Sequence, residues 1–222
     1  MTTSIITIEG DVLTQTTPPA LPHAPDQYSR QYHDQMNNVL RLYFNTLNNL
    51  ISQLRASAST TLTLPYGSFA DTTDQTAVVN TATVMKLNTT DFANGVSVVT
   101  SGGIPSRITV TTAGIYNFQW SGQFVNTDTQ EHDVSVWVRK NGTDVVGSTG
   151  FVSVINRHGG VDGHVLAGWN FFFSLSAGDY IELWWSTTNV GVSIQAFPVG
   201  AVPVRPSTSS LVATMAFVSA LP

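Results

Sequence analysis

The spacing of hydrophobic residues is helical in one early segment of the chain. No Gly or Pro occurs from Gln27 to Leu54, and apolar residues recur there at alternating intervals of four and three. This spacing places them on one side of an α-helix, at the a and d positions of successive heptads. It predicts a helix that begins after an N-cap at Asp26 and presents one apolar seam. The seam residues are Met36, Leu40, Tyr43, Leu47, Leu50 and Leu54.

The seam is wide, because Val39, Phe44 and Ile51 extend it into the flanking e and g positions. A wide seam suits three helices better than two, since each helix then faces two neighbours. The alternative is a single amphipathic helix packed on the rest of the chain, because three heptads are the lower limit for a coiled-coil prediction. We favour a trimeric coiled coil.

After residue 60 the pattern changes to short runs rich in Val, Ile, Thr and aromatic residues, separated by turn signals. Asn141-Gly142 is the strongest of these signals, because both positions tolerate positive φ in a two-residue hairpin. Many short strands at this spacing predict a mainly β sandwich or barrel. The expected strands lie at 106–112, 114–124, 133–140, 150–156, 167–176, 179–186 and 211–220.

The first 25 residues contain prolines at positions 18, 19, 22 and 25. Proline fixes φ and lacks an amide donor, so this segment is expected to be extended. A docking arm and a plain disordered tail are equally compatible with this composition. The chain therefore divides into an extended N-terminal docking arm (1–25), a helical trimerisation stalk with its linker (26–60) and a β head (61–222).

The charge content narrows the range of possible functions. Asp, Glu, Lys and Arg make up only 10% of the chain, against an average of about 25%. Uncharged surface of this kind is typical of contacts between subunits. The nine Lys and Arg are scattered and the net charge is −5, which argues against nucleic-acid binding. No segment is apolar for the roughly 20 residues of a membrane span, and the N-terminus lacks a signal-peptide pattern.

No motif of a known catalytic or cofactor site occurs, so we expect a non-enzymatic protein without cofactor. His132 lies among three acidic residues, but a solvated loop is the better interpretation of that cluster. The glycine-rich stretch 158–164 carries His158, Asp162 and His164. It is a candidate receptor-contact loop, and a plain loop or a metal site are the alternatives. The tryptophans are expected to pack in the core or at a subunit interface, with one of Trp184 and Trp185 inside and the other outside.

Four phrases of the β part occur in the order seen in a known family. They are YGSF at 66–69, AGIYNF at 113–118, LSAGDYIEL at 175–183 and MAFV at 215–218. With these phrases the β part resembles the heads of the complement C1q and tumour necrosis factor superfamily. The resemblance implies a ten-stranded jelly-roll sandwich that trimerises through a flat apolar face. The expected core residues of the head are Phe69, Tyr116, Phe118, Leu183 and Phe217.

The helix carries a second resemblance. The phrase YHDQMNNVLRLYF at 32–44 looks like the N-terminal region of structural proteins from aquatic tailed phages. It implies a homotrimeric virion protein, assembled in the host cytoplasm and bound to other virion proteins through residues 1–25. A tail or head fibre is expected, whose jelly-roll head serves host adhesion by contacting a surface glycan or protein. The alternatives are a capsid decoration or cement protein, a cellular carbohydrate-binding C1q-like module and a depolymerase.

Overall fold

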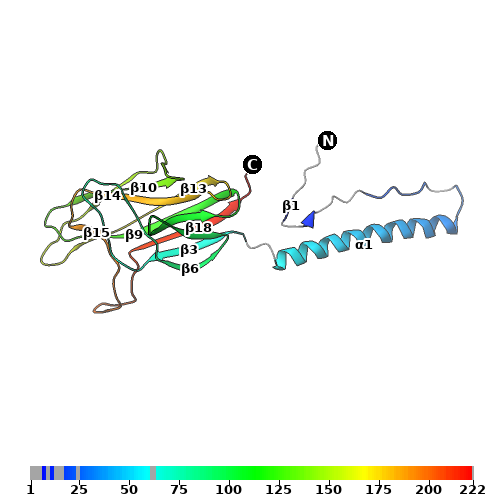
Figure 1. The fold of residues 1–222 in the computed structure, drawn as a ribbon. Coiled ribbons are helices and arrows are strands. Elements are labelled where there is room, and N and C mark those ends of the chain that lie inside the picture. Colours follow the sequence, from blue (N-terminus) through cyan, green and yellow to red (C-terminus); the bar gives the residue numbers. More distant parts are fainter. Residues whose placement is uncertain (1–6, 9–10, 13–17, 24–25, 61–63, 222) are drawn as a thin grey trace. The chain divides into compact units, whose positions relative to one another are not determined.

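The computed structural model of the 222-residue chain describes residues 7–8, 11–12, 18–23, 26–60 and 64–221. Side chains are described for 18–23, 26–52 and 64–221. The chain divides into two compact units, residues 1–63 and residues 64–222. Figure 1 shows the first unit with its helix and the second with its strands.

The first unit contains helix α1 (Arg30–Thr60) and the short antiparallel pair β1 (Thr7–Ile8) and β2 (Asp11–Val12). The prediction of a helix is confirmed, but both of its ends were placed wrongly. Ser29 rather than Asp26 caps the helix, since the Ser29 hydroxyl accepts the amide of Tyr32 at 3.3 Å. A side-chain oxygen bonded to the third helical amide is the usual N-cap geometry. Residues 55–60, the end of the segment predicted as stalk and linker (26–60), also belong to the helix, and Arg55, Ala56 and Ala58 favour it.

The second unit is mainly β and has the two-layer antiparallel arrangement of a β-sandwich. All seven predicted strands are confirmed, with ends within a few residues of those expected. One layer, here named the β9 sheet, runs in the order β4-β15-β9-β18-β3-β6, with β13 on the other side of β9. Its strands are β3 (Tyr66–Asp71), β4 (Gln75–Thr76), β6 (Thr89–Asn94), β9 (Gly114–Asn126), β13 (Gly163–Leu175), β15 (Val192–Ile194) and β18 (Leu211–Ser219).

The other layer, the β10 sheet, runs in the order β11-β10-β14-β8-β7, with β12 also paired to β10 and β5 to β14. Its strands are β5 (Thr83–Val84), β7 (Val96–Ser101), β8 (Ile104–Val110), β10 (His132–Lys140), β11 (Thr143–Asp144), β12 (Gly150–Val154) and β14 (Tyr180–Thr187). A separate two-stranded hairpin is formed by β16 (Gly200–Ala201) and β17 (Val204–Arg205).

Alternation of side chains between the two faces of each strand builds the core between the sheets. On β9, Tyr116 and Phe118 are fully buried, and the register aligns Phe118 with Met215 of β18. Of the other expected core residues, Phe69 and Leu183 are buried, while Phe217 is partly buried against the core. Trp185 is fully buried and its neighbour Trp184 is not, as alternation requires.

Two glycines occupy positions where the structure requires glycine. Asn141 and Gly142 have φ of 50° and 82° and join β10 to β11, which confirms the predicted hairpin. Gly114 opens β9 for a different reason, since a Cβ there would lie 2.2 Å from the Phe217 ring. The glycine of the AGIYNF phrase is therefore required by a long-range contact with the last strand.

The two ends of the β unit's chain lie together. The amide of Phe217 donates to the carbonyl of Pro65 at 2.8 Å, and the C-terminus lies near the start of β3 in Figure 1. We name this the terminal end. The opposite, loop end is where β9 finishes and β10 begins, and it carries the loops after β9, β12 and β14.

Candidate functional site

Helix α1 has an apolar seam that the described residues of its own unit do not bury. No side chain between Arg30 and Ser52 is buried, and the seam residues of that stretch are half-buried. These are Met36, Leu40, Tyr43, Leu47 and Leu50, whereas the side chain of Leu54 lies outside the described residues. Beside them, Phe44 and Ile51 are 59% and 46% exposed. Because most helix stability in proteins comes from packing of the apolar face, this seam calls for a partner.

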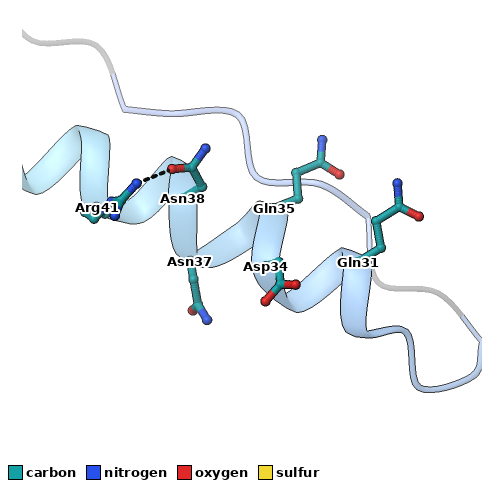
Figure 2. Close-up of a pocket in the computed structure, with 6 residues that line it drawn as sticks. All are labelled: Gln31, Asp34, Gln35, Asn37, Asn38 and Arg41. Carbon is teal, nitrogen blue, oxygen red and sulfur yellow. Dashed lines mark hydrogen bonds between the residues drawn. The ribbon is translucent and has the colours of Figure 1, made fainter.

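The opposite side of α1 is polar. Figure 2 shows a shallow depression there, lined by side chains from the first half of the helix, and Arg41 donates to the Asn38 carboxamide at 2.9 Å. At 100° per residue, these positions lie across the helix from the seam. The helix is therefore amphipathic, with its polar side suited to solvent. The lining residues are Gln31, Asp34, Gln35, Asn37, Asn38 and Arg41.

The two sheets differ sharply in charge. In the seven strands of the β9 sheet the only formal charges are Asp71, which is fully buried, and Asp91 on edge strand β6. The long strands β9, β13 and β18 contain no Asp, Glu, Lys or Arg. The β10 sheet carries six such residues. They are Arg107, Asp133, Arg139, Lys140, Asp144 and Glu182.

The outer face of the β9 sheet also exposes large apolar side chains. Leu166 and Phe172 of β13 are 64% and 61% exposed, and their register partners on β9 are Gln123 and Asn117. At the opposite edge, Phe92 is 61% exposed. Polar groups between these residues are amides and hydroxyls, apart from the Asp91 carboxylate beside Phe92, which accepts a hydrogen bond from the Ser68 hydroxyl at 3.0 Å. An uncharged face with exposed aromatics is the composition of an interface core rather than of ordinary surface.

On the β10 sheet, by contrast, the outward charges satisfy one another. Glu182 is 5% exposed and accepts hydrogen bonds from Ser106 at 2.9 Å, Arg107 at 3.4 Å and Trp184 at 3.3 Å. The guanidinium of Arg139 lies 3.7 Å from the centre of the Trp184 ring. This network leaves the Trp184 indole covered and its N–H paired, so it is a structural layer and not a sugar-stacking platform.

The three residues of the candidate receptor loop occupy three different settings. His158 begins a tight hairpin, since its amide and carbonyl both pair with Val161. Asp162 forms an ion pair with Arg157 at 3.2 Å. His164 lies on β13, and its ring centre is 5.5 Å from that of Phe197. Nothing in these contacts brings the three together as a metal site.

His132 and Asp128 do meet at the loop end. The His132 ring nitrogen lies 2.8 Å from Asp128, whose carboxylate also accepts from Asn189 at 3.1 Å. The hydrogen bond with His132, followed by that from the Thr129 amide, holds the pKa of Asp128 below its ordinary value. The carboxylate is thereby stabilised as an anion that ties the β9–β10 and β14–β15 loops. This arrangement accounts for the cluster structurally.

Within the described part of the chain, no three His, Cys, Asp or Glu side chains are grouped as metal ligands would be. The described residues also include no helix long and apolar enough to span a bilayer. The features that sequence reasoning missed are the uncharged outer face of the β9 sheet and the β16–β17 hairpin. The first could have been found, because 114–126 and 211–219 are visibly free of charge.

No protein-family model matches the chain, and no curated protein matches it.

Proposed function

We propose that this protein is a homotrimeric structural component of a bacteriophage virion, a fibre-type appendage that displays its β head. The observation that carries the proposal is the uncharged outer face of the β9 sheet. A sheet face that exposes Leu166, Phe172 and Phe92, and whose one carboxylate is Asp91 at the β6 edge, suits permanent burial against identical copies. The charged β10 sheet would then face solvent.

The strand order supports a jelly-roll head of the C1q and tumour necrosis factor type. Taking only strands of five residues or more, the β9 sheet runs β6-β3-β18-β9-β13 and the β10 sheet runs β7-β8-β14-β10-β12. Each sheet thus draws on strands from both halves of the chain, as a jelly roll does. The glycine and aromatic positions of the AGIYNF phrase also have a packing reason in the contact between Gly114 and Phe217.

The helix supports association through three chains. The described residues of its own unit leave the seam unburied, and a three-helix coiled coil would bury Leu40 and Leu47 together. The polar side shown in Figure 2 would remain in water. One symmetric assembly of three chains would bury both the helix seam and the outer face of the β9 sheet.

The virion assignment rests on the phage-like phrase at 32–44 and on the proline-rich segment before it. Residues 18–23 form neither helix nor strand, and Leu21 is 52% exposed. An exposed, extended segment of this kind suits docking onto another virion protein. At the loop end of the head, Val161 is 66% exposed beside His158, which suits contact with a host surface.

Incorporation into particles tests the virion role. Gradient-purified phage particles from the producing culture should contain the full-length protein. A variant lacking residues 1–25 should still form trimers but be absent from particles. If the full-length protein sediments apart from particles, the virion role is wrong, whatever its oligomeric state.

A further inference from the structure

An apolar hairpin projects from the β head. We name residues 197–205 the finger; it contains β16 and β17 and is the orange-red loop that extends beyond the labelled strands in Figure 1. Val199, Val202 and Val204 are 74%, 96% and 88% exposed. Its only charged residue, Arg205, is engaged within the finger, because its guanidinium donates to the Pro198 carbonyl at 2.9 Å. The finger therefore offers valines, and its one cation is held against the finger's own backbone.

The base of the finger rests on the outer face of the β9 sheet. The backbone of Phe197 pairs with that of Thr208, and its ring lies against His164. His164 stands two residues before the exposed Leu166 on β13 and therefore points to the same outer face. Val125 of β9 points to the same face and yet is only 1% exposed. The chain that leads into the finger thus runs over one end of this face, and the finger continues the uncharged surface beyond the sheet.

The finger is built as a fixed protrusion. Pro198 and Pro203 restrict its backbone, and Pro206 follows directly after it, which lowers the entropy lost when the finger becomes ordered in a contact. Its four paired residues lie outside both large sheets, and an isolated two-stranded hairpin is marginally stable in water. A rigid apolar hairpin that gains little from its own head is best explained by burial elsewhere.

We infer that the finger of each head packs against the neighbouring copy of this chain and clasps the trimer at its loop end. The inference rests on the proposed trimer, since the finger stands on the same face through which the heads would associate. A second copy is favoured over a host ligand by that continuity. In a cyclic trimer each finger would reach the next head, so three equivalent contacts would close the ring.

Thiol labelling of purified protein tests the clasp. The chain has no cysteine, so Val202→Cys supplies a single reporter at a side chain that is 96% exposed in one copy. Val146→Cys is the matched control: Val146 is 100% exposed and follows β11 at the terminal end. Both full-length variants are labelled under reducing conditions, and the reaction of each with a maleimide is timed in native buffer and in denaturant.

We expect the Val202→Cys thiol to react at least about tenfold more slowly than the control thiol in native buffer. In denaturant the two thiols should react equally fast. A tenfold difference corresponds to about 1.4 kcal/mol. In purified protein only another copy can provide this protection. Val199→Cys repeats the test if the first variant does not fold.

The mass of each labelled protein is measured by light scattering. If the two thiols react equally fast in native buffer and the mass is that of three chains, the clasp is wrong and the trimer is not affected. The finger would then be free to contact a receptor. Rapid labelling in a protein whose mass is that of one chain overturns both the clasp and the proposed trimer. The light-scattering mass therefore separates the two failures.

Discussion

Gly114→Ala is predicted to destabilise the head through one long-range contact. A Cβ at this position would lie 2.2 Å and 2.8 Å from two carbons of the Phe217 ring and 2.8 Å from the Ser219 carbonyl oxygen. The ring cannot simply rotate away, because it packs edge-on against Tyr116 with 5.5 Å between ring centres. Both the ring and the backbone of β18 must shift.

Overpacking of this kind costs about 1–3 kcal/mol. For a domain of this size, each kcal/mol lowers the unfolding midpoint by about 2–4 °C. Thermal unfolding followed by circular dichroism, at one fixed protein concentration, measures the shift. Gly150→Ala is the matched control, because a Cβ there would meet only the Trp169 ring at 3.4 Å. It should leave the midpoint nearly unchanged.

The double variant Gly114→Ala with Phe217→Leu separates packing from backbone effects. Removing the ring should restore part of the loss, so the two substitutions should be less than additive. Full restoration is not expected, since the Ser219 carbonyl remains close. The packing assigned to the AGIYNF phrase is wrong if Gly114→Ala is as stable as the wild type. It is also wrong if the losses of the two single variants, Gly114→Ala and Phe217→Leu, simply add in the double variant.

Two further predictions concern charge. Glu182→Ala removes the acceptor of three hydrogen bonds in the β10 sheet. It should lower the free energy of unfolding, measured in urea, by about 2–3 kcal/mol. Asp144→Ala, at an exposed ion pair, should lower it much less, and equal losses would contradict the network. Burial alone would raise the pKa of Asp179, but hydrogen bonds from Ser176 and Asn141 and the Lys140 ammonium at 3.1 Å lower it below 3.8. The stability that this lowered pKa contributes is present above the pKa of the unfolded state and is lost as pH falls through the pKa of the folded state. Asp179→Asn should therefore flatten the decline of the urea midpoint below about pH 4. An unchanged decline would refute the assignment.

The sequence predicted the elements whose signal is local. Strands β9 and β10 alternate over much of their length, and Asn141-Gly142 specifies its turn without help from the rest of the chain. Strands of two or three residues, such as β4 and β15, were missed because they have too few residues to show a period. The helix start was misplaced because Asp26 and Ser29 are both good N-caps and only the fold selects between them.

The interaction surfaces were harder to foresee for a different reason. The finger contains two prolines, Pro198 and Pro203, which argue against a strand in any local reading. It nevertheless forms a hairpin, anchored by the contact between Phe197 and His164. The candidate loop residues His158, Asp162 and His164 are close in sequence but turn to separate partners. The partners of His158 and Asp162 are local, Val161 and Arg157, whereas His164 meets Phe197 through a pairing that no short segment encodes.

The mass of the purified chain in solution tests the central claim most directly. Light scattering of the full-length protein should give about 72 kDa, three times the chain mass of 23.9 kDa. The seam variant Leu40→Asp with Leu47→Asp should shift the mass distribution toward smaller species as the protein is diluted. A wild-type mass near 24 kDa, unchanged at high concentration, would contradict the trimer and with it the role proposed for the uncharged face.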